Sequence, residues 1–170
     1  MIETSNIYAL AYSSRCSADV LNSDLDEILV DASAHNRMAD VTGVLLFDGV
    51  NFLQYLEGPE EAVASVFDRI KSSKRHKDIR VLTSGEVPER YFWNWSMACR
   101  HADASMIQRI EAARWGERTH PHLEADGEQN PGLRLLADFW SSVVQDQEQQ
   151  QARDDKRDSA NRADLTDEGE

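Results

Sequence analysis

The sequence is poor in cysteine, in long apolar runs and in positive charge. Only two of its 170 residues are cysteines, Cys16 and Cys99, which excludes a disulfide scaffold and makes a reducing cytoplasm the expected location. No run approaches the roughly 18 apolar residues of a membrane span, and the first residues lack the pattern of a secretory signal peptide. With 18 bases against 31 acids, the net charge is −13. This argues against a nucleic-acid-binding surface, which needs clustered lysine and arginine.

The negative charge is concentrated at the C-terminal end. Residues 146–170 hold nine acids and four bases, with one leucine and no aromatic residue. Such a segment buries too little apolar surface to offset the entropy of ordering, so it is interpreted as a disordered acidic tail. The preceding chain is interpreted as one domain over residues 1–100 with a helical extension over residues 101–145.

Apolar periodicity predicts an α+β fold. Patterns of period two and β-forming residues predict strands over residues 6–14, 41–47, 51–56, 79–82 and 93–99. Asp48-Gly49 predicts a hairpin between the second and third strands. Apolar residues at helical spacing predict a helix from Ser23 to about Asn36 and another from Pro59 to about Arg75. The order β-α-β-β-α-β-β is the ferredoxin-like arrangement with one added strand.

Two further helices are expected to cover the second face of this sheet. Apolar spacing predicts them over about residues 103–114 and 132–144, separated by a loop over residues 117–131. In that loop, His120 and His122 are interpreted as polar surface, because two nearby histidines alone rarely form a metal site.

Three polar side chains fit a plain core poorly. Gln54 shares a strand face with Phe52 and Leu56, and a buried carboxamide needs partners for two donors and an acceptor. From the pattern alone, a wetter patch of an edge strand explains Gln54 better than a ligand contact does. Tyr12 fits a core tyrosine whose hydroxyl reaches a polar atom. Asn36 fits a helix C-terminal cap, and each of the three could instead contact a ligand.

Together, five short blocks follow one another in a recognisable order. They are Tyr12-Ser13-Ser14, Asn36 before Thr42-Gly43, the block from Phe52 to Gly58, Arg75-His76, and Trp95-Ser96-Met97. Over about residues 6–99 this pattern resembles the BLUF domain, a family of blue-light sensors that use FAD. The remaining chain resembles the helical cap of short, stand-alone members. The resemblance implies the same ferredoxin-like fold, with the flavin held between the two helices on the sheet.

The resemblance also implies roles for individual residues. Tyr12 matches the photoactive tyrosine, Gln54 the switching glutamine, and Trp95 and Met97 the relay pair near that glutamine. Contacts to the cofactor are implied for Asn36, Gln54, Arg69, His35 and His76. Ser73 departs from the pattern, since some members carry aspartate there. The residue types suit the chemistry, because an excited flavin oxidises tyrosine and a glutamine can relay the proton.

The implied function is a reversible light sensor that is not an enzyme and signals to a separate protein. A homo-oligomer is expected, without nucleic-acid or membrane partners. Two alternatives remain: a flavin-dependent oxidoreductase, although the G-x-G-x-x-G fingerprint is missing, and a ferredoxin-like interaction module without a chromophore. A LOV photoreceptor is discounted, because Asn51-Phe52-Leu53-Gln54 lacks the cysteine that forms its photoadduct.

Overall fold

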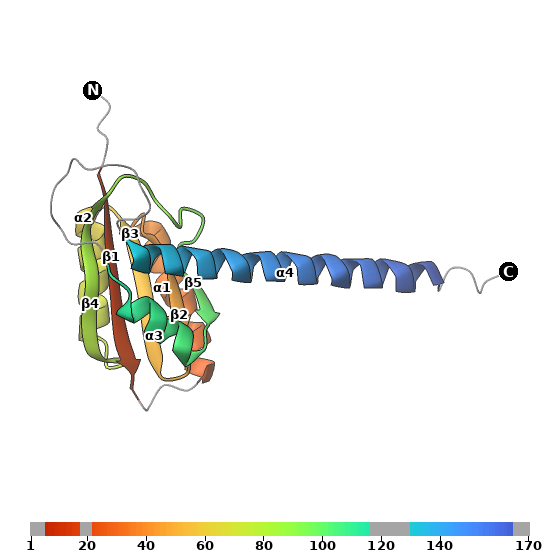
Figure 1. Cartoon of the computed structure of the whole chain (residues 1–170), viewed down its shortest axis with the longest axis horizontal. Helices are drawn as coiled ribbons and strands as arrows, with labels where there is room; N and C mark the ends of the chain where they lie inside the picture. The colour runs from red at the N-terminus through yellow and green to blue at the C-terminus, as the bar shows by residue number, and fades with distance from the viewer. Residues whose placement is uncertain (1–5, 18–21, 116–129, 165–170) are drawn as a thin grey trace, which may run out of the picture. The chain divides into compact units, whose positions relative to one another are not determined.

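The structure is a computed structural model that describes residues 6–17, 22–115 and 130–164. The chain divides into two compact units, Met1–Gly132 and Leu133–Glu170. Among the residues that the structure describes, the first unit contains the whole sheet and three helices (Figure 1).

A five-stranded sheet organises the first unit. Its strands are β1 (Ile7–Cys16), β2 (Thr42–Phe47), β3 (Asn51–Gly58), β4 (His76–Val87) and β5 (Ala98–His101). They lie in the order β4-β1-β3-β2-β5, and only the β2–β5 pair is parallel. The first four strands form the ferredoxin-like sheet and β5 extends it beyond β2, so the predicted fold is confirmed.

The hairpin between β2 and β3 has the predicted turn. Gly49 has a φ of +98°, which is accessible to glycine without strain. The Asp48 carboxylate accepts the backbone N–H groups of Val50 (2.8 Å) and Asn51 (2.7 Å). This local bonding places β3 directly beside β2, in the register that pairs Leu45 with Gln54.

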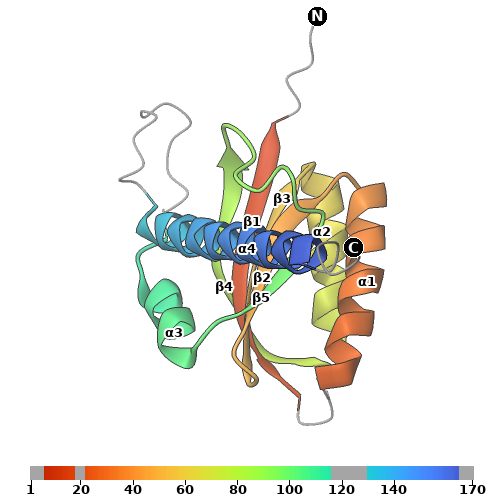
Figure 2. The same cartoon turned by 90° about the vertical axis from the view of Figure 1, so that its right-hand side faces the viewer.

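Helices cover both faces of the sheet. Figure 2 shows α1 (Asn22–Met38) and α2 (Glu60–Ser72) on one face and α3 (Ala104–Ala112) on the other. The side chains of neighbouring β1 residues confirm this, since consecutive strand residues point to opposite faces. The ring of Tyr12 packs against Phe67 of α2, whereas the Ser13 hydroxyl donates to Glu111 of α3 at 2.8 Å.

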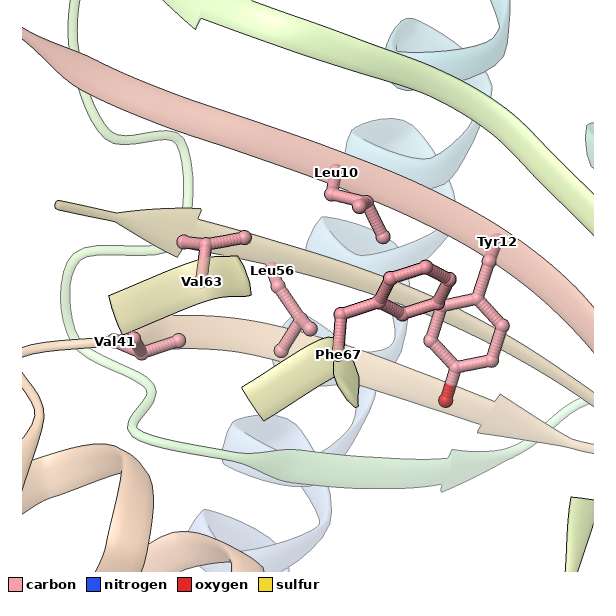
Figure 3. Packing of buried hydrophobic residues seen from close by; sticks show 6 residues of the cluster. All are labelled: Leu10, Tyr12, Val41, Leu56, Val63 and Phe67. Atoms are coloured by element: carbon pink, nitrogen blue, oxygen red, sulfur yellow. The ribbon is translucent and has the colours of Figure 1, made fainter. Parts of the chain in front are cut away.

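One hydrophobic core lies between the sheet and α2. Six buried side chains form it, and Figure 3 shows the ring of Phe67 beside that of Tyr12. These six are Leu10, Tyr12, Val41, Leu56, Val63 and Phe67. α2 contributes to this core through Val63 and Phe67, spaced four residues apart as one helix face requires.

The predicted fifth strand over residues 93–99 is wrong in its position. β5 begins at Ala98, and the side chain of Trp93 is 70 % exposed. The preceding residues run beside β2, because the N–H of Gly43 donates to the carbonyl of Trp95 at 2.7 Å. They do not belong to the strand, whose pairing with β2 begins at Ala98. Further upstream, the N–H groups of Tyr91 and Phe92 donate to the Glu57 carboxylate. A side chain therefore takes the bonds that a strand partner would have taken.

The predicted disordered tail is corrected for residues 146–164. They continue α4 (Pro131–Asp164), which is 34 residues long. The amides of Gln150 and Gln151 donate to Asp154 (3.2 Å) and Asp155 (3.0 Å), one helical turn further on. Such pairs and good helix-forming residues stabilise a helix without burying apolar surface.

Residues 116–129, with His120 and His122, and residues 165–170 lie outside the described residues. Within the part of the chain that is described, no helix has the length and apolar character needed to cross a membrane.

Candidate functional site

Tyr12 and Gln54 meet at the centre of the sheet. The antiparallel register of β1 and β3 places them directly opposite each other, and both side chains point toward the α1 and α2 face. Tyr12 is fully buried and its hydroxyl donates to Oε1 of Gln54. Burial raises the pKa of Tyr12 far above its ordinary value, so the phenol stays protonated across the whole working pH range.

Gln54 makes a second contact on its other side. Its Nε2 donates to Sδ of Met97 at 3.2 Å. Thioether sulfur is a weak acceptor, so this bond is the more easily exchanged of the two. The expectation of a wet edge position for Gln54 is wrong. β3 lies between β1 and β2, and the side chain is only 6 % exposed.

Asn36 connects α1 to the segment that carries Met97. Its buried Nδ2 donates to the carbonyl oxygen of Ser96 at 2.9 Å. The helix continues two residues further, to Met38, so Asn36 lies inside its last turn and does not follow it as a cap. Its backbone carbonyl accepts the N–H of Val41 at 2.8 Å, which joins the end of α1 to the start of β2.

His76 completes the polar cluster from the β4 side. Its Nδ1 lies 2.9 Å from the Ser14 hydroxyl, and its ring contacts the rings of Tyr12 and Phe52. Burial, and secondly the positive charge of Arg75, lower the pKa of His76 to about 4. The imidazole is therefore neutral at pH 7 and can act as both donor and acceptor.

Not every residue implied by the resemblance joins this cluster. Arg69 on α2 and His35 on α1 are exposed, and within the described ranges neither forms a hydrogen bond to Tyr12 or Gln54. Trp95 is partly buried.

Sequence reasoning assigned no role to Glu57, which is completely buried. The sequence feature that could have drawn attention to Glu57 is its position, a carboxylate directly after the largely apolar block that begins at Phe52.

The site thus joins an oxidisable buried phenol, a carboxamide bonded on both sides and a strand that leads away from it. Residues 7–98 match the family model described as BLUF, sensors of blue-light using FAD. The chain belongs to the BLUF family. Its BLUF region contains Tyr12, Gln54 and Met97, and the α4 helix lies beyond that region.

Curated relatives match over about half of this chain. The blue light- and temperature-regulated antirepressor BluF of Escherichia coli (strain K12) is 39 % identical over 83 residues, which cover 49 % of this chain and 21 % of the relative. The photoactivated adenylate cyclase subunit alpha of Euglena gracilis is 35 % identical over 86 residues, or 51 % of this chain and 8 % of the relative. The match therefore spans only a small part of these relatives.

Two solved structures illustrate the similarity in fold. The dark-state structure of BlrB, a BLUF protein, has a TM-score of 0.58 and 28 % identity, covering 63 % of this chain and 83 % of that one. The ground state of BlsA has a TM-score of 0.56 and 30 % identity, covering 60 % of this chain and 69 % of that one.

Proposed function

We propose that this chain is a blue-light photoreceptor that binds FAD non-covalently beside Tyr12 and Gln54. The observation that supports this most directly is the hydrogen-bonded series from Tyr12 through Gln54 to Met97. A donor and an acceptor on one rotatable group, placed between an oxidisable phenol and a weak acceptor, suit a reversible switch. Membership of a family of sensors that use FAD supports the choice of cofactor.

The residues of the site fit a flavin ring. One edge of that ring presents carbonyl oxygens and an imide N–H, and a carboxamide can both donate to and accept from such an edge. The buried carboxamides of Gln54 and Asn36 supply this chemistry, and neutral His76 lies against the ring of Tyr12. Nearby Phe52 and Phe67 suit a flat apolar ring face. Further contacts with the cofactor are proposed for Arg69 and His35, whose exposed side chains can reorient.

When bound and excited by blue light, the flavin supplies a strong one-electron oxidant. Loss of an electron from Tyr12 makes its hydroxyl strongly acidic, and the proton then moves along the existing hydrogen bond to Oε1 of Gln54. A carboxylate at that position would be costly to bury and, when ionised, could not donate. Return of the electron, together with a proton from Gln54, restores the neutral phenol. When that proton comes back from Oε1, the carboxamide is left as an amide in a rotated position, and when it comes from Nε2, the carboxamide is left as the imidic tautomer; both have exchanged partners.

The exchange reaches β5 through Met97, which directly precedes that strand. One exchanged hydrogen bond is worth about 1 kcal/mol, which is enough to bias two alternative packings of β5 and the helices that follow. Trp95, two residues upstream of Met97, belongs to the same relay. We propose that the output is a contact with a separate protein, made by a homo-oligomer in the cytoplasm, and that the chain itself has no catalytic activity.

Absorption spectroscopy of the purified protein in the dark and after blue light tests this proposal. A yellow protein whose flavin band shifts slightly to the red and recovers in the dark is expected. Gln54→Leu and Tyr12→Phe should bind flavin but lose the normal shift, whereas Tyr55→Phe, on the opposite face of β3, should keep it. An unaltered photocycle in the first two variants would contradict the assigned roles.

Two further measurements separate the alternatives. Chromatography of the released cofactor distinguishes FAD from FMN, which is named in a solved BlrP1 structure of Klebsiella pneumoniae. Reduction of the bound flavin by an added nicotinamide cofactor, with turnover, would favour an oxidoreductase. A protein that remains colourless after refolding with flavin would favour a module without a chromophore.

A further inference from the structure

A buried carboxylate lies on the opposite face of β3 from Gln54. Glu57 is completely buried and its two oxygens accept three hydrogen bonds. Oε2 accepts the N–H of Tyr91 (2.9 Å), and Oε1 accepts the N–H of Phe92 (2.6 Å) and the hydroxyl of Thr42 (3.2 Å). Two of these donors belong to the backbone of the segment that leads to β5.

Arg90 ties the start of the same segment to the turn before β2. Its Nη2 donates to the backbone carbonyl and to the carboxylate of Asp40, both at 2.8 Å. Its Nη1 donates to the Thr42 hydroxyl (3.0 Å) and to the backbone carbonyl of Glu57 (3.3 Å). The guanidinium therefore bridges two strands and the segment, and its side chain is only 16 % exposed.

Residues 90–97, here called the Met97 segment, are held at successive points. Glu57 and Arg90 hold its beginning, while the backbone carbonyls of Trp95 and Ser96 accept bonds from β2 and α1 near its end. The next residue is Met97, the partner of Gln54. Since residues 90–97 lie outside the ladder, these bonds take the place of strand pairing in setting the path of the backbone.

The chemistry of Glu57 is unusual for a purely packing role. Burying a carboxylate is costly unless every oxygen is bonded, and an apolar residue would fill the same space without that cost. A carboxylate adds directional hydrogen bonds that an apolar residue lacks, because it accepts two consecutive backbone N–H groups and so fixes their positions. Glu57 and Gln54 also lie three residues apart on one rigid central strand, so one strand sets the position of both ends of the Gln54–Met97 contact.

We propose that Glu57, supported by Arg90, is a positioning residue of the photocycle that holds Met97 within reach of the Gln54 carboxamide. Glu57 acts through the path of the Met97 segment and does not itself touch the phenol or the carboxamide. This inference rests on the proposed photoreceptor function, in which Gln54 exchanges its bond to Met97.

The test is a mutant cycle on the full-length, FAD-bound protein, with the dark recovery rate of the flavin absorption shift as the readout. It compares the wild type, Glu57→Gln, Met97→Ala and the double variant. Glu57→Gln keeps the shape of the side chain but replaces one accepting oxygen with a donor group that faces a backbone N–H. The matched control is Glu89→Gln, the same change at an exposed position just before the segment.

Glu57→Gln is expected to keep the red shift, since the Tyr12–Gln54 bond is untouched, and to change the recovery rate about fivefold, the factor for one hydrogen bond. In the Met97→Ala background the same substitution should add no further change, whereas a merely structural effect would multiply. Glu89→Gln should recover at the wild-type rate. Equal rates for Glu57→Gln and Glu89→Gln, or multiplying effects in the double variant, would overturn the inference.

If Glu57→Gln does not fold, Arg90→Lys takes its place in the same cycle, because lysine keeps the charge but loses the planar fork. The same outcomes are then decisive. Absence of any light-induced shift in the wild type would defeat the proposed function and this inference with it. A normal wild-type photocycle whose recovery rate is unchanged by the substitution tested, Glu57→Gln or its replacement Arg90→Lys, would defeat only the inference.

Discussion

Two tyrosines in neighbouring positions of the sheet offer a matched test of how this site is built. Tyr12 and Tyr55 are 0 % and 1 % exposed, and the register pairs Tyr12 with Gln54, the residue before Tyr55. The Tyr12 hydroxyl donates to Oε1 of Gln54. The Tyr55 hydroxyl lies on the other face, near the Glu57 carboxylate, and makes no hydrogen bond of ordinary geometry within the described residues. Replacement of each by phenylalanine deletes the same atom from two different environments.

The magnitudes follow from which polar atoms are left without partners. Tyr12→Phe leaves a buried carboxamide oxygen without its donor, which costs about 1–3 kcal/mol in the free energy of unfolding. Tyr55→Phe removes a buried hydroxyl that is not bonded, so the free energy of unfolding should stay within about 0.5 kcal/mol or rise. The two variants should therefore differ by about 1–3 kcal/mol. Ionisation of the phenols cannot explain why Tyr12→Phe should be the less stable variant, because burial raises the pKa of both tyrosines.

Urea unfolding at a saturating FAD concentration measures this difference. At a slope of about 2 kcal/mol per molar urea, the midpoint of Tyr12→Phe should lie about 0.5–1.5 M below that of Tyr55→Phe. The FAD affinity of each variant is measured separately, since ligand binding adds its own contribution to stability. Equal midpoints, or a larger loss for Tyr55→Phe, would refute the assignment of partners in this site.

Three further predictions concern the rest of the chain. Because the pKa of His76 is lowered to about 4 by burial and by Arg75, the unfolded state binds its proton first as the pH falls below about 6.5. Stability should therefore decline by at most about 3 kcal/mol between pH 6.5 and 4, and His76→Gln should flatten that part of a plot of unfolding free energy against pH; an unchanged slope would contradict the buried neutral ring. Phe92→Ala should cost about 3–5 kcal/mol in thermal or urea unfolding because Phe92 is buried, whereas Trp93→Ala should change stability by less than about 0.5 kcal/mol. Equal losses of stability in the two variants would indicate that Trp93 is buried, as the predicted strand over residues 93–99 requires. Gln150→Pro should reduce the helical circular dichroism at 222 nm, because proline disfavours a helix interior by about 3 kcal/mol, and an unchanged spectrum would indicate that this region is not helical in solution.

The polar tail shows one limit of reasoning from composition. The scarcity of apolar residues after position 146 correctly indicates that the segment has no core of its own. It does not exclude a helix, whose hydrogen bonds lie within the segment itself and whose Gln150–Asp154 pairs need no partner element. Low hydrophobicity therefore predicted the exposed side chains of residues 146–157 and mispredicted the backbone.

Local patterns were sufficient for the order of the elements, because strand alternation, helical spacing and the Asp48-Gly49 turn depend on neighbouring residues alone. They also singled out Tyr12, Gln54 and Asn36 as polar residues in apolar surroundings. Strand order was needed to show that Gln54 is central and directly opposite Tyr12. The path of residues 90–97 was likewise decided by the buried Glu57, a residue more than thirty positions away. Contacts between distant segments depend on packing and register, which no local sequence pattern contains, and in this protein those contacts bring Tyr12, Gln54 and Met97 together.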